Sequence, residues 1–505
     1  MEIWELGARS IREKILKKQI SAQEALDSFL ARTSEVEPKV NAYLDLSEAQ
    51  ARVDAARVDS VIMRGEDPGL LAGLPVALKD NLNMKGTQCT CGSKILEGYV
   101  SPYDATVVSK LRRAGAVFTG KTNCDEFAMG SSTQHSAFGI TRNPWELSRV
   151  PGGSSGGSAA VVAAGMTPLS LGSDTGGSIR QPASFTGICG LKPTYGRVSR
   201  YGLVAFASSL DQVGPFGASV WDCALALEAM AGNDPNDITS SKSPVVPYTS
   251  RLDRSVKGLV AGVPREMMEV LDPGVRSEFN SALKTLQDLG VTVEEMSLPT
   301  TEYCLDVYYI VSAAEASSNL GKFDGVRFGR RASSHDLTGM YFETRGQELG
   351  EEVQRRILLG TFALSDGYYD AYYLKAAKIR TLIRRDFQRA FSRYDVLLSP
   401  TTPMVAFNIG EKAKDPLSMS AVVAVNLAGL PALSVPCGFS RADETEKLLP
   451  CGLQIIGKPY DEETILSLGY AFENASLDKI APRGIAMRKG LAMEKECEVV
   501  VSETV

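Results

Sequence analysis

Helical periodicity and short apolar runs alternate along much of this chain. Residues 104–123, DATVVSKLRRAGAVFTGKTN, have the pattern of a helix that ends at Gly115 and is followed by a short strand. Residues 273–299 repeat that order, with the strand VTVEEM after the helix. The apolar residues of this second helix fall close to one face: Val275, Phe279, Leu283, Leu286 and Leu289. This alternation predicts an α/β fold in which helices cover a largely buried sheet.

The N-terminal region has the pattern of a helical scaffold. Ser21 and Glu24 form a capping box, and residues 1–57 are predicted to be N-terminal helices that pack on the core. The apolar run that follows, GLLAGLPVALKDNL, has the length of a strand that ends at Lys79. A charged residue is therefore expected at the end of a buried strand.

The remainder of the chain is predicted to form one large body. Residues 303–394 are rich in Tyr, Arg and Glu at helical spacing, which indicates a helical insertion that covers one side. The pattern returns to strands at DVLLSP and LPALSVP, and neither a repeat nor a long linker divides residues 58–485. Residues 486–505 are predicted to be a peripheral tail.

Composition narrows the possible partners and the compartment. Hydrophobic residues make up 44% and charged residues 23% of the chain, which is typical of a globular protein with a sizeable core. The net charge of −6 argues against this surface as the main electrostatic contact with nucleic acid. The 9 cysteines lack the C-x-x-C spacing of zinc or redox sites, so no metal site is predicted and reduced thiols in the cytoplasm are expected.

No segment has the pattern of a membrane anchor. The N-terminus alternates charged and apolar residues at helical spacing and lacks the apolar stretch of a signal peptide. Residues 150–173 and 417–440 carry no charge, but proline and many small polar residues interrupt both windows. Both windows are predicted to be buried interior.

The Gly/Ser-rich stretch VPGGSSGGSAA, residues 150–160, is the first candidate for chemistry. Its GSSGG fits the G-x-S-x-G elbow of serine hydrolases, which requires a preceding strand and a later histidine. The chain has two histidines; His135 precedes the motif, and His335 lies in a charged segment. A phosphate-binding loop is a weaker alternative, since neither G-K-[ST] nor G-x-G-x-x-G is present. Ser281 and Lys284 match Ser-x-x-Lys but belong to the amphipathic helix above, where a surface position is favoured.

A serine nucleophile without histidine needs another base, and lysine is the usual substitute. The lysine must then be neutral, and burial among uncharged groups lowers its pKa in that direction. A second Gly/Ser-rich segment, SDTGGSIRQPA at 173–183, has two glycines before Ser178. These glycines allow successive backbone N–H groups to point at one spot, as an oxyanion hole requires, although a tight Gly-Gly turn explains the segment equally well.

Taken together, these motifs resemble the amidase signature family. Lys79 in GLPVALKDN, Ser154 in PGGSSGGSAA and Ser178 in GSDTGGSIRQPA resemble its Ser–Ser–Lys triad in order, spacing and surrounding glycines. The resemblance implies a single large amidase-type α/β domain with a mixed sheet covered by helices on both faces. It also implies that Ser178 is the acylated nucleophile and that Ser154, after a cis peptide bond, relays the proton to Lys79. Backbone N–H groups of Thr175, Gly176, Gly177 and Ser178 would hold the oxyanion.

Longer strings resemble one branch of the family, the glutaminase subunits of tRNA-dependent amidotransferases. These strings are DEFAMGSST, YGLVAFASSLDQVGP, EASSNLGKFDGVRFG and EEVQRRILLGTFALSDGYYDAYY. The resemblance implies that the chain hydrolyses glutamine and supplies ammonia for converting Glu-tRNA(Gln) to Gln-tRNA(Gln). It implies a heterotrimer with the B and C subunits of the amidotransferase as partners, in which tRNA, ATP and Mg²⁺ are held mainly by the B subunit. No cofactor is expected in this chain.

Two features bear on the substrate. Arg356 matches the arginine that grips the glutamine α-carboxylate in this branch, and a guanidinium fork suits that contact. The aspartate that binds the glutamine ammonium has no counterpart, because DPLSMSAVVAVNLAG at 415–429 is shorter than the family pattern and has no acid between Met419 and Asn426. Asp415 and carbonyl groups are alternatives, and the position stays unassigned. A free-standing amidase with the same triad and a scaffold subunit without turnover are the alternative functions.

Overall fold

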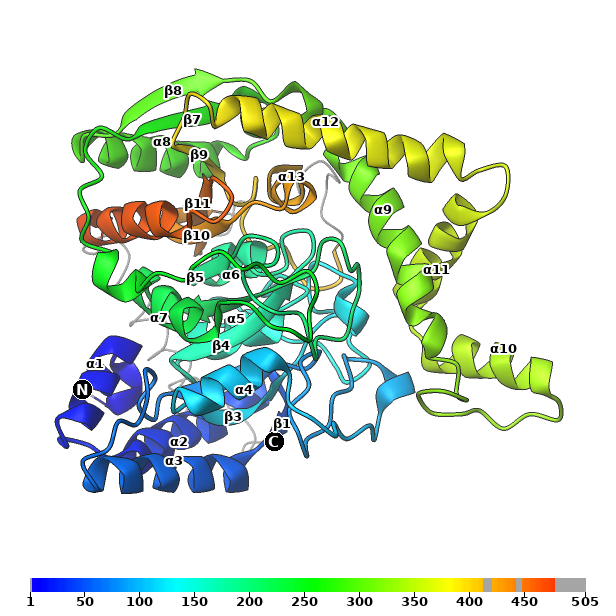
Figure 1. The fold of residues 1–505 in the computed structure, drawn as a ribbon, viewed down its shortest axis with the longest axis horizontal. Coiled ribbons are helices and arrows are strands. Elements are labelled where there is room, and N and C mark those ends of the chain that lie inside the picture. Colours follow the sequence, from blue (N-terminus) through cyan, green and yellow to red (C-terminus); the bar gives the residue numbers. More distant parts are fainter. Residues whose placement is uncertain (1, 412–419, 442–446, 477–505) are drawn as a thin grey trace, which may run out of the picture.

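One large sheet organises the molecule, and the computed structural model describes residues 2–411, 420–441 and 447–476 of it (Figure 1). The sheet has 11 strands in the order β1-β3-β2-β4-β6-β5-β10-β11-β9-β7-β8. In chain order they are β1 (Tyr43–Leu46), β2 (Pro75–Lys79), β3 (Val117–Thr122), β4 (Leu169–Asp174), β5 (Cys189–Lys192), β6 (Gln212–Gly217), β7 (Val260–Pro264), β8 (Thr292–Met296), β9 (Val396–Pro400), β10 (Ala432–Arg441) and β11 (Leu448–Gly457). Parallel and antiparallel pairs both occur, so the predicted mixed α/β sheet is confirmed.

Helices cover both faces of this sheet (Figure 1). They are α1 (Ala8–Leu16), α2 (Ala22–Val40), α3 (Glu48–Met63), α4 (Thr106–Arg113), α5 (Gly156–Ala163), α6 (Arg180–Thr186), α7 (Val220–Met230), α8 (Pro273–Asp288), α9 (Cys304–Asn319), α10 (Leu337–Glu348), α11 (Glu351–Leu364), α12 (Lys375–Ala390) and α13 (Ser420–Ala428). Residues 462–476 are helical as well. Among the described residues, no helix combines the length and hydrophobicity needed to cross a membrane.

The N-terminal region is more than the helical scaffold expected for residues 1–57. Besides α1 and α2 it contributes β1, which pairs antiparallel with β3 at one edge of the sheet, and α3 continues to Met63. The Ser21 capping box is present at the start of α2, where the Ser21 hydroxyl accepts the Glu24 N–H at 3.0 Å. The four-residue β1 is too short for its alternation to be recognised in the sequence, and its pairing partner supplies the stabilisation.

Region 303–394 contains α9 to α12, and its helices form the projecting part of the molecule. Figure 1 shows α9 and α11 side by side, with α10 at their outer end and α12 returning toward β7 and β9. The described structure ends before the predicted tail, so residues 486–505 lie outside the described residues.

The carboxyl ends of three neighbouring strands place the candidate site. β2 pairs in parallel with both β3 and β4, so these strands end at the same edge of the sheet. Lys79 is the last residue of β2 and Asp174 the last of β4. The uncharged window 150–173 is buried throughout, and it includes α5 beside these strand ends. Loops at such an edge are the common position of α/β active sites.

Candidate active site

Three serine hydroxyls surround the amine of Lys79 inside the protein. Lys79 Nζ lies 2.7 Å from Ser154 Oγ, 2.9 Å from Ser155 Oγ and 3.0 Å from Ser173 Oγ. Lys79, Ser154 and Ser155 are fully buried, and Ser173 is 2% exposed. Ser173 Oγ also accepts a hydrogen bond from Asn81 Nδ2 at 2.9 Å. The amine therefore has hydroxyl partners and no carboxylate partner among the described residues.

This environment favours a neutral amine. Burial lowers the pKa of Lys79, and the charges of Cys124 and Asp125 oppose that shift without cancelling it. Hydroxyl groups solvate an ammonium less well than water does, so the charged form loses more on burial than the neutral form. The lowered pKa makes the neutral form, which can accept a proton, more accessible to Lys79 than to an exposed lysine.

Glycines allow the backbone around Ser154 to pack closely against the segments near Lys79. The peptide bond between Gly153 and Ser154 is cis, as the resemblance implies. A side chain at Gly153 would collide with the Asp125 carboxylate and the Ser132 backbone, and one at Gly157 with Asn123 backbone atoms. The first turn of α5 therefore packs directly against the loop after β3, which brings the Ser154 hydroxyl to Lys79.

Ser178 lies in the short turn between β4 and α6, and the Asp174 carboxylate holds that turn. Asp174 Oδ1 accepts the Gly177 N–H at 2.8 Å, and Oδ2 accepts the Ile179 N–H at 3.2 Å. The guanidinium of Arg180 contacts both carboxylate oxygens at 3.1 Å. Burial alone would raise the pKa of Asp174, but the Arg180 charge holds it well below its usual value. An ionised carboxylate thus fixes the backbone on either side of Ser178.

The backbone N–H groups of this turn are not equivalent. The Gly177 N–H, one of the four predicted oxyanion donors, already donates to Asp174 Oδ1, and Gly177 has a φ of 117° that favours glycine. The N–H groups of Thr175, Gly176 and Ser178 have no hydrogen-bond acceptor within the described part of the chain. The geometry leaves these three donors available for an anion.

Ser178 and Arg356 line the same cavity, which has a volume of about 760 Å³. Arg356, on α11, is 6% exposed, and its Nε donates to Glu352 Oε1 at 2.7 Å. Its Nη1 is buried and has no hydrogen-bond partner among the described residues. The rings of Phe206 and Tyr309 lie 5.6 Å and 5.1 Å from the guanidinium carbon. A buried guanidinium with an unused donor is well suited to bind a carboxylate.

The structure brings the three residues of the proposed triad to one edge of the sheet. Ser154 joins Lys79 directly, whereas no hydrogen bond joins Ser154 Oγ and Ser178 Oγ within the described residues. Ser178 is 7% exposed and faces the cavity, while Lys79 and Ser154 lie behind it. The cavity wall therefore separates an accessible hydroxyl from a buried base.

Comparison with known proteins matches this arrangement to one family. The profile of the Amidase family matches residues 24–466. The chain belongs to the amidase signature family. The matched range includes Lys79 and the three serines around its amine, the turn held by Asp174, and Arg356 of the cavity.

The relatives of this amidase narrow the resemblance further. This chain is 56% identical over 490 residues to the A subunit of glutamyl-tRNA(Gln) amidotransferase from Carboxydothermus hydrogenoformans, and the match covers 96% of this chain and 100% of the relative. It is 54% identical to the protein of that name from Geobacillus stearothermophilus, covering 94% and 98%. The crystal structure of the same subunit from Thermotoga maritima has a TM-score of 0.75 at 42% identity, covering 94% and 95%. A bacterial aryl acylamidase has a TM-score of 0.83 at 26% identity, covering 96% and 98%.

The other serine motifs do not have the geometry that their chemistry requires. In the amidase, the GSSGG stretch follows a loop and not a strand, and Ser155 is buried with its hydroxyl directed at the Ser173 carbonyl. His335 is exposed in the projecting region. Ser281 and Lys284 are exposed on α8. The elbow and Ser-x-x-Lys hypotheses are therefore wrong.

Sequence reasoning missed part of the site. Ser155 and Ser173 also lie within hydrogen-bond distance of the Lys79 amine, and Asp174 positions the turn of Ser178. Adjacent serines in PGGSSGG and a serine ahead of the GGS turn were the available signals. Neither signal indicates which hydroxyls face the amine, because that depends on how β2, β4 and α5 pack.

Within the described residues, α13 supplies no aspartate for a substrate ammonium. Asp415 lies outside the described residues, and α13 carries no acid. Acidic side chains do line the amidase cavity: Glu126, Glu351, Glu352 and Glu411. Glu352 is already paired with Arg355 and Arg356, which hold its pKa at about 2 despite burial that would raise it.

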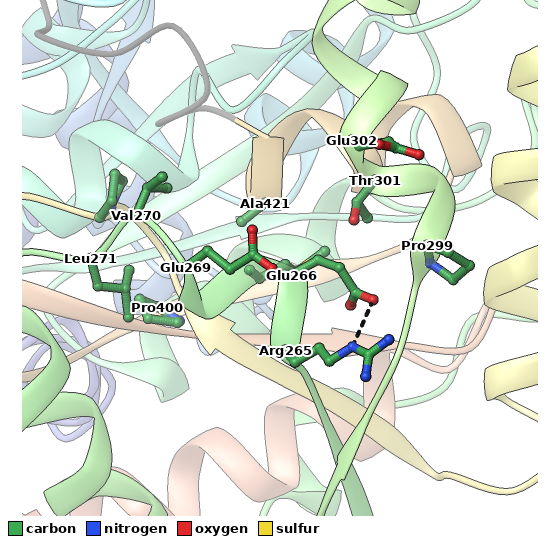
Figure 2. A pocket seen from close by; sticks show the side chains of 12 residues that line it. Arg265, Glu266, Glu269, Val270, Leu271, Pro299, Thr301, Glu302, Pro400 and Ala421 are labelled. Carbon is green, nitrogen blue, oxygen red and sulfur yellow. Dashed lines mark hydrogen bonds and ion pairs between the residues drawn. The ribbon is translucent and has the colours of Figure 1, made fainter.

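A second cavity of about 740 Å³ opens beyond the ends of β7 and β9 (Figure 2). Figure 2 shows Glu266 turned toward Arg265, with which it forms an ion pair at 3.4 Å. Glu266 also accepts the Leu298 N–H at 2.9 Å. Neither Ser178 nor Arg356 lines this cavity, so it is separate from the amidase site. Within the described residues, no group of His, Cys, Asp and Glu side chains is arranged to hold a metal ion.

Proposed function

We propose that this amidase is the glutaminase subunit of glutamyl-tRNA(Gln) amidotransferase. The observation that carries the proposal is the direct contact of the buried Lys79 amine with Ser154, behind a cavity that Ser178 and Arg356 share. The choice of this enzyme is supported by relatives that carry the name of this subunit. They are more than half identical to this chain over nearly its whole length.

In the proposed reaction, Ser178 attacks the side-chain amide of glutamine. The Ser178 proton passes to Ser154, whose own proton passes to the Lys79 amine, and a bond forms between Ser178 Oγ and the amide carbon. The free N–H groups of Thr175, Gly176 and Ser178 stabilise the oxyanion. Collapse breaks the C–N bond and releases ammonia, which takes up the proton held by Lys79. Water then attacks the glutamyl ester and passes a proton through Ser154 to Lys79. As the ester bond to Ser178 Oγ breaks, that proton returns through Ser154 to Ser178, and glutamate leaves.

Arg356 is proposed to bind the α-carboxylate of glutamine. Its Nη1 donor is buried and has no partner among the described residues, which leaves it available to a substrate carboxylate in the cavity that Arg356 lines. A buried charge-assisted hydrogen bond of this kind contributes more to binding than a neutral one. The carboxylates that line the cavity are the available partners for the substrate ammonium.

The ammonia would be used by partner proteins. We place the chain in a cytoplasmic heterotrimer with the B and C subunits of the amidotransferase, where the B subunit holds tRNA and uses ATP and Mg²⁺ to activate Glu-tRNA(Gln). The sequence of this chain has no G-K-[ST] phosphate loop, and its net charge is −6. Both features fit a chain that leaves the nucleotide and the tRNA to its partner.

The decisive experiment measures conversion of Glu-tRNA(Gln) by the heterotrimer with glutamine or with ammonium as nitrogen donor. Ser178→Ala is expected to abolish the glutamine-supported conversion and to leave the ammonium-supported conversion intact. Equal loss of both would show that Ser178 has a structural role in the complex.

A free-standing amidase is the second candidate, favoured by the missing aspartate and by the similarity to the aryl acylamidase structure. This candidate predicts rapid hydrolysis of aryl amides by the isolated chain. Glutamine hydrolysis that is at least about tenfold faster than hydrolysis of acetanilide would exclude it.

A further inference from the structure

The three hydroxyls around Lys79 cannot all play the same part. A neutral amine has two N–H donors and one lone pair, so only two of its three contacts can be N–H donations. The third must be a hydroxyl that donates to the nitrogen. Which serine donates decides which proton the amine receives.

The contact distances separate the three serines. Bonds to oxygen are typically about 2.7–2.8 Å long from O–H donors and about 2.9–3.0 Å long from N–H donors, within an N–H···O range of about 2.7–3.2 Å. The Ser154 contact is 2.7 Å, whereas those of Ser155 and Ser173 are 2.9 and 3.0 Å. Ser154 therefore has the distance of the donor to Nζ, and the other two have the distance of acceptors.

The partners of Ser155 and Ser173 lead to the same assignment. The Ser155 hydroxyl donates to the Ser173 carbonyl at 3.1 Å, so its oxygen is left to accept from Lys79. Ser173 Oγ accepts from Asn81 Nδ2 at 2.9 Å and keeps one lone pair that can accept from Lys79 Nζ, which lies 3.0 Å away. The Ser173 carbonyl thus fixes Ser155 as an acceptor toward Lys79, and the longer Ser173 contact fits the same role.

We propose that Ser155 and Ser173 are positioning residues that each accept one N–H of neutral Lys79 and so direct its lone pair at the Ser154 hydroxyl. The inference rests on the proposed role of Lys79 as the base. It assigns a reason for two serines that the triad does not include: without them, the amine is free to rotate and its lone pair is not held toward Ser154.

Charged groups near the amine stay constant when these hydroxyls are changed. Cys124 and Asp125 follow β3, Asp174 ends β4, Asp211 precedes β6, and α5 contributes no titratable side chain. Each of the three acids is bound elsewhere: Asp125 by the Thr133 N–H, Asp174 by Arg180, and Asp211 by the Thr175 hydroxyl. The ion pair of Asp80 and Lys121 joins the residue after Lys79 to β3. None of these groups hydrogen-bonds Lys79 Nζ among the described residues.

The test measures how fast phenylmethanesulfonyl fluoride labels Ser178 in the full-length chain as the pH rises. Labelling forms an Oγ–S bond and releases fluoride, while the Ser178 proton passes through Ser154 to Lys79. In Ser155→Ala and Ser173→Ala, the plateau rate is expected to fall by at least about tenfold, as for loss of a positioned base. The pH at which the labelling rate reaches half of its plateau (the midpoint) is expected to fall by roughly one unit or more, because the Lys79 ammonium loses a hydrogen-bond acceptor.

Ser170→Ala is the matched control. Ser170 is a buried serine of β4 whose hydroxyl donates to the Ser158 carbonyl at 2.6 Å and does not contact Lys79. This variant is expected to keep the wild-type midpoint. Circular dichroism checks folding, and if Ser155→Ala does not fold, Ser173→Ala decides. Wild-type midpoints in both serine variants would overturn the inference while leaving the triad intact; labelling at a residue other than Ser178 would overturn the proposed nucleophile itself.

Discussion

Two lysines on adjacent strands show how differently the same buried side chain can behave. Lys79 ends β2 and Lys121 lies on β3, where its backbone pairs with Leu78. Side chains alternate along a strand, so the two lysines point to opposite faces of the sheet. Both are fully buried. Lys121 donates to Asp80 Oδ1 at 2.7 Å, whereas Lys79 meets only serine hydroxyls.

The partner, and not the burial, determines the charge. Burial acts against the ammonium in both cases, but the Asp80 charge outweighs it and raises the pKa of Lys121. At Lys79 nothing comparable compensates, and the pKa is lowered. The fold thus builds a structural cation and a candidate base from the same residue type on neighbouring strands. Substitution of Lys79 should therefore reduce activity, whereas substitution of Lys121 should reduce stability.

Lys79→Met should have the largest effect, and the effect should be on activity. Without the amine there is no acceptor for the Ser154 proton, so glutamine hydrolysis is expected to fall by at least about 10³-fold. Ammonia release by the heterotrimer measures this. Stability should not fall, because the fold does not pair this amine with a carboxylate and burial disfavours its charged form. Residual activity within tenfold of the wild type would contradict Lys79 as the base.

Lys121→Met should mainly affect stability. It leaves the Asp80 carboxylate buried without its cation, which typically costs about 3–5 kcal/mol. Urea unfolding measures the loss. The double variant Lys121→Met with Asp80→Asn should recover part of it, because no unpaired charge then remains. A single variant that unfolds within about 1 kcal/mol of the wild type would show that the ion pair is dispensable.

Arg356→Lys tests the role of a third buried cation in substrate binding. Glu352 occupies its Nε, and its Nη1 is free for a substrate carboxylate. Lysine keeps the charge and loses the fork, so KM for glutamine should rise about 10- to 100-fold with a smaller change in kcat. Arg52→Lys, an exposed ion pair on α3, is the control and should leave both constants unchanged. An unchanged KM in Arg356→Lys would place the carboxylate elsewhere.

Local sequence patterns were sufficient for parts of this picture. The apolar run ending at Lys79 and the alternation around residues 104–123 and 273–299 predicted β2, α4, β3, α8 and β8 where the structure has them. The mixed α/β fold was predicted by family resemblance and is confirmed. These features depend on residues close in sequence or on long matching strings. The roles of Lys79, Ser154 and Ser178 stay predictions.

Other features depend on packing between distant segments and were not predictable. β1 is stabilised by its pairing with β3, and β5 pairs with β10, more than 200 residues away in sequence. The acceptor roles of Ser155 and Ser173 exist only because β2, β4 and α5 converge on one nitrogen. The Gly177 N–H was expected in the oxyanion hole, but the ionised Asp174 carboxylate competes for it as a nearby charged acceptor.

The last expected effect is a difference in how stability depends on pH. The lowered pKa of Lys79 means that the unfolded chain binds more protons than the folded chain up to the ordinary lysine value of 10.5. The wild type should therefore gain stability relative to Lys79→Met as the pH rises from 7 to 9.5. The raised pKa of Lys121 keeps its contribution complete below that ordinary value, so the gap between wild type and Lys121→Met should stay constant over the same range. Urea unfolding at several pH values measures both gaps, and a constant gap for Lys79→Met would mean that the folded and unfolded chains hold the same charge at this position.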